Sequence, residues 1–198
     1  MPLQTNLFYY LRNALCLVLL GLGPAAHAQK PLGTLLPIIP QPVRVQLNGG
    51  PFVLTSRTSV HTGPGLAPDA AALFRQYVRT VGRLALSEKP GAAVDGIYLR
   101  LDSQAVTHRE GYRLVVAPHR ITVTGHDAAG VFYGLQSLSQ LLPAGTGGAL
   151  RVPGCVVEDY PRFGYRGLHL DVSRHLFPLP VLKKWLDVLA FYKINTFH

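Results

Sequence analysis

Cysteine is scarce in this sequence, and charged side chains are few. The 198 residues include two cysteines, Cys16 and Cys155, and 15% of the chain is Asp, Glu, Lys or Arg. If the first 28 residues are removed, as argued below, Cys155 alone remains, and one cysteine cannot form an internal disulfide. A disulfide framework is therefore excluded for the mature chain. We interpret Cys155 as a small buried residue.

Acidic residues are also few, since ten Asp and Glu stand against nineteen Lys and Arg, a formal net charge of +9. A nucleic-acid-binding protein would gather its basic residues on one face or in one run. Here they are scattered singly, and the densest cluster is the pair Lys183-Lys184. The ordinary interpretation is a soluble basic protein, and we expect no nucleic-acid partner. The hydrophobic content of 48% is sufficient for a substantial core.

The apolar run near the N-terminus, Ala14 to Gly23, is shorter than the roughly 20 residues that span a bilayer. Arg12 precedes this run, and Ala26-His27-Ala28 follows it with the small-residue pattern of a cleavage site. These features predict a secretory signal over residues 1–28, cleaved after Ala28, and export to the periplasm or the medium. No cysteine closely follows the run, so we expect no stable membrane anchor.

Residues 29–157 are predicted to form an α+β domain in which helices cover one face of a sheet. Alternation with a period of two indicates the strands, and apolar spacings of three and four indicate two helices, the second capped by Asp127. The predicted strands are 43–47 and 52–54 as a hairpin, 59–62, 97–101, 112–117 and 120–124 as a second hairpin, and 150–157. The predicted helices are 69–86, which buries Leu73, Tyr77, Val81 and Leu84, and 128–142, which buries Val131, Leu135, Leu138 and Leu142.

Residues 158–198 show a different pattern, in which strand, helix and strand alternate. A mostly apolar strand is predicted over 165–172, then a helix with Pro180 in its first turn, and a new strand from Ile194. Two strands joined by one helix run parallel with a right-handed crossover. We therefore predict the truncated start of a (β/α)8 TIM barrel, which needs about 250 residues to close. The predicted buried stripe of the helix is Leu182, Trp185, Leu186, Leu189 and Tyr192.

The run RFGYRGLHLDVSRH, from Arg162 to His175, is similar to the start of the catalytic barrel in family 20 glycoside hydrolases, the β-N-acetylhexosaminidases. Phe177-Pro178 and residues 192–198 (YKINTFH) share in this resemblance. The hairpin over 110–125 and the segment over 129–138 (AGVFYGLQSL) resemble the N-terminal accessory domain of the family.

The resemblance implies an activity on glycans that contain N-acetylhexosamine. Such enzymes remove terminal N-acetylglucosamine or N-acetylgalactosamine with retention, and the acetamido oxygen of the substrate attacks the anomeric carbon. An adjacent Asp-Glu pair on a later barrel strand orients the acetamide and supplies the general acid and base. No residue of this chain matches that pair, so we expect the 198 residues to be inactive by themselves. The resemblance implies no cofactor.

Arg166 is the strongest site candidate that the resemblance offers, because the Arg of this Arg-Gly pair is expected to bind the sugar hydroxyls. The alternative is an arginine paired with a structural carboxylate. Asp171 is interpreted as a supporting residue that anchors Arg166 or a neighbouring loop, or as purely structural. Arg174 and His175 are expected to shape the mouth of the site. His169 and His175 have no third ligand nearby, so we expect no metal site.

Glu158-Asp159 is an adjacent acidic pair, but it precedes the first predicted barrel strand. Barrel active sites lie at the C-terminal ends of the strands, and neighbouring residues of an extended segment point to opposite faces. We therefore expect the pair to cap or to bridge the two domains. Two other functions stay open: a non-catalytic secreted module that binds a glycan or a protein, and a different glycosidase with a similar accessory domain.

Overall fold

The structure is a computed structural model of the chain, and it describes residues 36–66, 68–86, 96–144 and 148–198. These residues belong to one compact unit. The predicted secretory signal over residues 1–28, with Cys16, lies outside the described residues. Within the described ranges, no helix combines the length and the apolar character that crossing a membrane requires.

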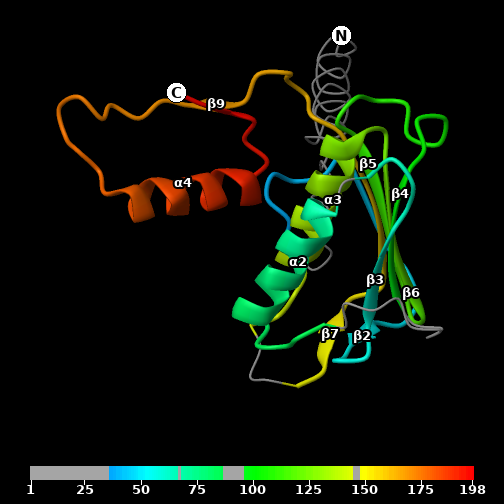
Figure 1. Cartoon of the computed structure of the whole chain (residues 1–198). Helices are drawn as coiled ribbons and strands as arrows, with labels where there is room; N and C mark the ends of the chain where they lie inside the picture. Colours follow the sequence, from blue (N-terminus) through cyan, green and yellow to red (C-terminus); the bar gives the residue numbers. More distant parts are fainter. Residues whose placement is uncertain (1–35, 67, 87–95, 145–147) are drawn as a thin grey trace, which may run out of the picture. The chain divides into compact units, whose positions relative to one another are not determined.

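A six-stranded mixed sheet is the frame of this unit (Figure 1). Its strands, from one edge to the other, are β1 (Arg44–Leu47), β8 (Cys155–Asp159), β5 (Tyr112–Ala117), β6 (Arg120–Gly125), β4 (Gly96–Leu101) and β3 (Ser59–Thr62). β3, β4 and β6 run parallel, and the other pairings are antiparallel. Two helices, α2 (Asp69–Thr80) and α3 (Ala128–Gln140), lie on the same face of the sheet (Figure 1). The predicted α+β domain, with its helices on one face, is confirmed.

The hairpin of β5 and β6 and the helix α3 follow the prediction closely. Successive residues of β5 point alternately to the core and to the opposite face, so Tyr112, Leu114 and Val116 are buried while Arg113 is exposed. The Asp127 side chain accepts a hydrogen bond from the backbone N–H of Gly130 at 2.8 Å, and it thereby caps α3 as predicted. All four residues of the predicted apolar stripe of α3 are buried.

The predicted N-terminal hairpin is wrong. β1 pairs with β8, while β2 (Phe52–Leu54) pairs with β7 (Leu150–Val152) in a separate two-stranded sheet. The predicted strand over 150–157 is accordingly two strands, interrupted at Pro153-Gly154, where the N–H of Asn48 donates to the carbonyl of Gly154 at 2.9 Å. Alternation along the chain indicates a strand but not its partner, and both partners here are about 100 residues away in the sequence.

The predicted extent and buried face of α2 are also wrong. The helix ends at Thr80, six residues before the predicted end at Leu86. The buried residues within the helix are Ala71, Phe74 and Val78. Of the predicted stripe, Leu73 and Val81 are exposed and Tyr77 is half-buried, whereas Leu84, beyond the end of the helix, is buried as predicted. Both sets have helical spacing, so spacing did not identify the face that packs on α3 and the sheet.

The C-terminal segment consists of β9 (Gly167–Leu168), α4 (Leu179–Phe191) and β10 (Thr196–Phe197). The two strands are parallel, as predicted, but β9 is much shorter than the predicted strand over 165–172. Of the predicted stripe of α4, Leu189 is buried as predicted, but Trp185, Leu186 and Tyr192 are exposed in the described chain. Two strands of two residues offer too little surface to cover this face.

Two glycines of α3, Gly130 and Gly134, allow the helix to approach the sheet closely. A Cβ atom on Gly130 would overlap the carbonyl oxygen of Gly111, and one on Gly134 would overlap the side chain of Val123. The carbonyl oxygen of Gly111 is a backbone atom, so it cannot move aside by a side-chain rotation. Gly130 therefore limits how close α3 lies to the turn before β5.

We predict that Gly130→Ala lowers the free energy of unfolding by about 2 kcal/mol, because overpacking costs about 1–3 kcal/mol and outweighs the helix propensity of Ala. Urea unfolding followed by circular dichroism measures the change. Gly164→Ala is the matched control, since a Cβ there would meet no atom within 4 Å, and we expect a change below about 0.5 kcal/mol. Equal stability of Gly130→Ala and the wild type would contradict this packing.

Candidate functional site

The carboxyl ends of the parallel strands β9 and β10 meet at one edge, called the carboxyl edge below. His169 and His198 follow the two strands there, and their Nδ1 atoms lie 2.7 Å apart. The backbone fixes this pair, because the N–H of Leu170 donates to the carbonyl of His198 at 2.7 Å and the N–H of His198 donates to that of Leu168 at 3.0 Å. In a β/α barrel, substrate-contacting groups lie at this edge.

Asp171 holds the loop that follows β9. Its Oδ1 accepts the backbone N–H groups of Ser173 at 2.9 Å and Arg174 at 3.2 Å, and its Oδ2 pairs with Nε of Arg174 at 3.2 Å. Of the two supporting roles predicted for Asp171, the structure shows the loop contact. The side chain of Arg174 is 85% exposed, and His175 is exposed beside it. No group of three or more His, Cys, Asp or Glu in the described ranges is arranged to hold a metal ion.

Arg166 lies at the opposite end of β9, directly before its first residue. Its Nε donates to the carbonyl of Lys193 at 2.8 Å, and its Nη1 donates to that of Phe163 at 2.9 Å. Its Nη2 donates to Oε2 of Glu110 at 2.6 Å and to the hydroxyl of Tyr133 at 3.0 Å. These contacts engage four of the five guanidinium N–H groups. The side chain, which is 16% exposed, thus has the structural carboxylate that the alternative interpretation requires. Sugar binding by Arg166 stays a prediction.

The partners of Arg166 are themselves fixed by the predicted α+β domain. The Asp127 carboxylate that caps α3 also accepts the N–H of Glu110 through Oδ2 at 3.0 Å. Glu110 has a φ of 57°, in the left-handed region, at the turn before β5. The guanidinium of Arg166 also lies 5.3 Å from the ring centroid of Tyr133, which α3 contributes. One capping residue therefore orients both the helix and the acid that receives Arg166.

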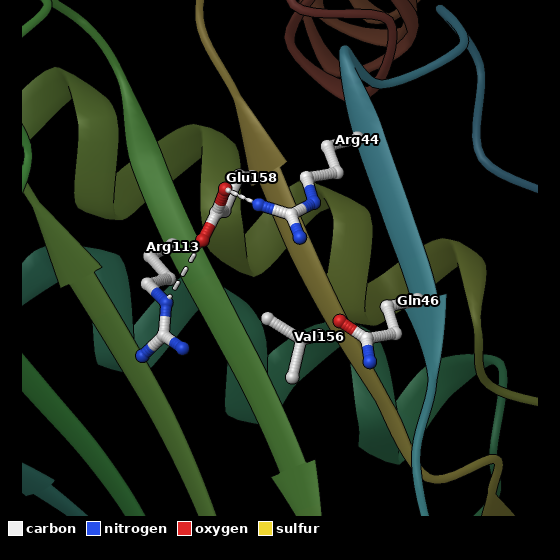
Figure 2. Close-up of a pocket in the computed structure, with 5 residues that line it drawn as sticks. All are labelled: Arg44, Gln46, Arg113, Val156 and Glu158. Carbon is white, nitrogen blue, oxygen red and sulfur yellow. Dashed lines mark hydrogen bonds and ion pairs between the residues drawn. The ribbon is translucent and has the colours of Figure 1, made fainter.

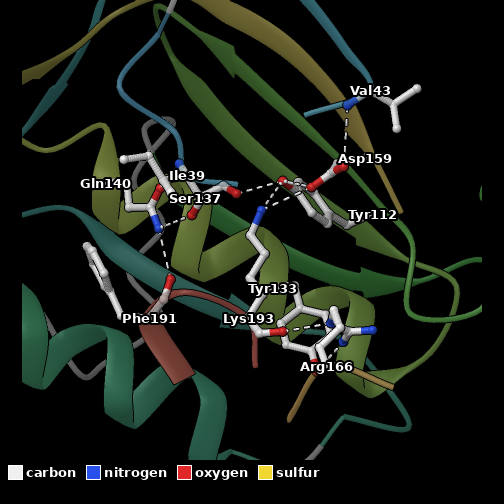
Figure 3. Close-up of polar contacts among 10 residues, drawn as sticks. All are labelled: Ile39, Val43, Tyr112, Tyr133, Ser137, Gln140, Asp159, Arg166, Phe191 and Lys193. Atoms are coloured by element: carbon white, nitrogen blue, oxygen red, sulfur yellow. Dashed lines mark hydrogen bonds and ion pairs between the residues drawn. The ribbon is translucent and has the colours of Figure 1, made fainter. Parts of the chain in front are cut away.

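Lys193 forms a second, more deeply buried contact between the same two parts of the chain (Figure 3). Its Nζ donates to the hydroxyl of Tyr112 at 2.9 Å and to Oδ2 of Asp159 at 3.0 Å. The Tyr112 hydroxyl donates to the same Asp159 oxygen at 3.0 Å and lies 2.6 Å from Oγ of Ser137. The side chains of Lys193 and Asp159 are only 7% and 13% exposed. We call these four residues the buried network.

The pKa values of two groups in the buried network are displaced mainly by burial. Burial lowers the pKa of Lys193, and the negative charge of Asp159 opposes part of this effect. Burial raises the pKa of Tyr112 well above its usual value, and the charge of Asp159 adds to the increase. Lys193 also has a φ of 61°, in the left-handed region, two residues after the end of α4.

The two acidic residues at the end of β8 have different neighbours. Asp159 joins the buried network and also accepts the N–H of Val43 at 3.4 Å (Figure 3). Glu158 pairs instead with Arg44 and Arg113 on the face of the sheet that carries no helix. Asp159 thus connects the C-terminal segment to the sheet, whereas Glu158 does not. Their opposite orientations follow from their adjacent positions on one strand.

Gln140, at the end of α3, provides a third polar contact with the C-terminal segment. Its Nε2 donates to the carbonyl of Phe191 at 2.8 Å and to that of Ile39 at 2.9 Å, while its Oε1 accepts the N–H of Ile39 at 2.6 Å (Figure 3). Sequence reasoning missed Gln140, Glu110, Tyr133 and Lys193. The sequence held a signal for Lys193, because a lone lysine follows the mostly apolar run of residues 188–192 in a chain with few charged residues.

Two family models match nearly all of the described chain. The model described as glycosyl hydrolase family 20, domain 2, matches residues 35–160. The model described as glycosyl hydrolase family 20, catalytic domain, matches residues 163–198. The change from one to the other falls between β8 and β9.

Several similar proteins with curated names or solved structures are named as hexosaminidases. A β-N-acetylhexosaminidase of Cellulomonas fimi is 37% identical over 169 residues, which are 81% of this chain and 33% of that protein. A β-hexosaminidase of Porphyromonas gingivalis is 34% identical, over 81% of this chain and 22% of that protein. A mutant β-hexosaminidase of Streptomyces plicatus, solved with its product GlcNAc, has a TM-score of 0.73 at 33% identity and covers 82% of this chain and 34% of that one. The chain thus spans a third or less of these two curated relatives.

We predict that Asp159→Asn lowers the free energy of unfolding by about 3 kcal/mol, because it leaves a buried ammonium without its carboxylate. Lys193→Met should cost less, since Asp159 keeps the Tyr112 hydroxyl and the N–H of Val43. The double variant should lose less than the sum of the two, with a coupling of about 1.5 kcal/mol or more. Urea unfolding of the four proteins measures this cycle. Additive losses would show that the two charges do not interact.

Proposed function

The chain belongs to glycosyl hydrolase family 20, and from this we propose that it supplies the accessory domain and the first βα unit of a secreted β-N-acetylhexosaminidase. Such an enzyme removes terminal N-acetylglucosamine or N-acetylgalactosamine from glycans. The observation that carries the proposal is the match of residues 163–198 to the catalytic domain of the family. The parallel strands β9 and β10 within that range support it.

We propose that β9, α4 and β10 begin a (β/α)8 barrel. α4 supports this assignment, because Trp185 and Leu186 are exposed on a helix that has no layer over them in the described chain. A groove of about 650 Å³ between α2, α3 and α4 is lined mainly by aromatic and aliphatic side chains, Phe74, Tyr77, Phe132, Leu135, Val188 and Phe191 among them. Further barrel elements would bury such apolar surface.

The proposed mechanism is retaining and substrate-assisted, with an acid and base from an Asp-Glu pair elsewhere in the catalytic domain. Asp171 is the one carboxylate at the carboxyl edge among the described residues, and both of its oxygens hold the Arg174 loop. It is therefore a poor general acid. We propose that the 198-residue chain does not hydrolyse glycosides by itself.

Two arginines compete for the sugar contact in this proposal. Arg174 lies after β9 on the carboxyl-edge side, is 85% exposed, and is oriented by Asp171. Arg166 lies at the other end of β9 and has one guanidinium N–H without a described partner. Binding two vicinal hydroxyls takes at least two donors. The geometry therefore favours Arg174 as the sugar-contacting residue and Arg166 as support for the strand that leads to it.

A chimera tests the proposal, in which residues 35–198 replace the matching segment of the Cellulomonas fimi enzyme. We predict that it hydrolyses a chromogenic N-acetylglucosaminide, whereas the 198-residue chain does not. In the chimera, Arg174→Gln should lower kcat/KM about 10- to 100-fold, as expected for the loss of a charge-assisted hydrogen bond. Arg166→Gln should instead lower the stability and leave kcat/KM of the folded enzyme within a few-fold of the parent.

Lys183→Gln is the matched control for the charge change, because Lys183 is exposed on α4, and it should leave both quantities unaltered. A large loss of kcat/KM in Arg166→Gln with unchanged unfolding, and none in Arg174→Gln, would return the sugar contact to Arg166. A folded chimera without any turnover would count against the hexosaminidase proposal itself.

A further inference from the structure

The face of the six-stranded sheet that carries no helix has an unbalanced charge. Alternation along the strands turns Arg44, Arg113, Arg120 and Arg100 to this face, and the buried residues between them point to the helices. Glu158 is the acidic residue that the described strands place there. The solvent-facing side of a sheet is ordinarily polar, and charges of both signs are ordinarily interspersed on a protein surface. Four arginines against one glutamate exceed that expectation.

Three of these arginines lie in one row across the strands. The strand register places Arg44 opposite Glu158, Glu158 opposite Arg113, Arg113 opposite Thr124, and Thr124 opposite Arg100. We call these five residues the arginine row. Each pair of successive arginines is separated by one strand, and strands lie roughly 4.8 Å apart, so the arginines repeat about every 10 Å.

The ion pairs within the row leave its arginines accessible. Glu158 lies between Arg44 and Arg113, 3.6 Å from the first and 3.2 Å from the second (Figure 2). All three side chains are more than 40% exposed, and exposed pairs of this kind contribute little to stability. Together with Gln46 and Val156 they line a hollow of about 150 Å³ (Figure 2). The row is thus not explained by a structural need for these pairs.

Flat ring surfaces lie next to the row on the same face. The register places Tyr98 opposite His61, and their rings stack with centroids 4.6 Å apart. The guanidinium of Arg120 lies 4.6 Å from the Tyr98 ring centroid. Arg100, on the same strand as Tyr98, donates through Nε to Thr124 at 2.8 Å, and no acidic partner is recorded for it within the described ranges. These contacts hold the guanidinium of Arg120 against the Tyr98 ring, so a fourth positive charge is fixed beside the row on this face.

We propose that this face binds an anionic polysaccharide with one carboxylate in each disaccharide, in which N-acetylhexosamine alternates with a uronic acid. The planar guanidinium matches a carboxylate in two parallel hydrogen bonds. A disaccharide of an extended β-linked chain has about the length that separates successive arginines of the row. The choice of N-acetylhexosamine as the neutral sugar rests on the proposed function, whereas the binding face rests on the arginine row.

Two other occupants fit this face less well. A second copy of the chain would bring two cationic faces together, and like charges oppose that contact. A nucleic-acid strand carries a phosphate about every 3.4 Å along a duplex, roughly three times denser than the arginines of the row. A sparsely charged polymer matches the spacing better.

The test measures binding of fluorescently labelled hyaluronan oligosaccharide to the 198-residue chain at low salt. Arg100→Gln and Arg113→Gln should each weaken binding about three- to tenfold, as expected for the loss of one exposed charge-assisted contact. Glu158→Gln should strengthen binding about threefold, because it removes the one negative charge in the row. Arg79→Gln on α2, an exposed residue of the helix layer with the same change in charge, should change binding less than twofold.

Two comparison ligands decide between the occupants. A neutral N-acetylglucosamine oligomer of equal length should bind much more weakly than hyaluronan, and single-stranded DNA should not bind more tightly. Equal affinity for the neutral oligomer, tighter binding of DNA, or an effect of Arg79→Gln as large as that of Arg100→Gln would overturn the inference. None of these outcomes depends on hydrolysis, so a failed hexosaminidase chimera would leave this test intact.

Discussion

A lysine ammonium buried between a tyrosine hydroxyl and a carboxylate is the contact on which the position of the C-terminal segment depends. Lys193 leaves α4 in a left-handed backbone conformation and reaches Tyr112 and Asp159 inside the α+β domain. The segment itself buries little apolar surface, since Leu189 is the one buried residue of α4. Its attachment therefore depends on polar contacts, and breaking one of them would leave a buried polar group unpaired at a large cost in free energy.

Arg166 and Gln140 complete this attachment at two further points. Arg166, the residue directly before β9, donates hydrogen bonds to Glu110 and Tyr133. Gln140 donates a hydrogen bond to the carbonyl of Phe191, the last residue of α4. The α+β domain thus fixes both the beginning and the end of the C-terminal segment. In the proposed enzyme, this arrangement would position the carboxyl edge, with Arg174, relative to the rest of a barrel.

Local patterns predicted the parts of the fold that local contacts determine. The β5–β6 hairpin, the Asp127 cap and the parallel β9–β10 pair were all accessible from alternation, capping chemistry and the short strand–helix–strand spacing. The partners of β1 and β2 were not, because they lie near residue 150 and periodicity carries no information on distant pairing. The partner of Arg166 could not be predicted for the same reason, because Glu110 is distant in the sequence and becomes its neighbour only after folding.

Native-state hydrogen exchange of the backbone amides of Asn195 and His198 tests the attachment most directly. These amides bond to the carbonyls of Arg166 and Leu168 within the C-terminal segment. If the buried network holds the segment in place, both amides exchange only through an opening that costs several kcal/mol, comparable to the amides of β5. Exchange at nearly unprotected rates, while β5 and β6 stay protected, would contradict this account.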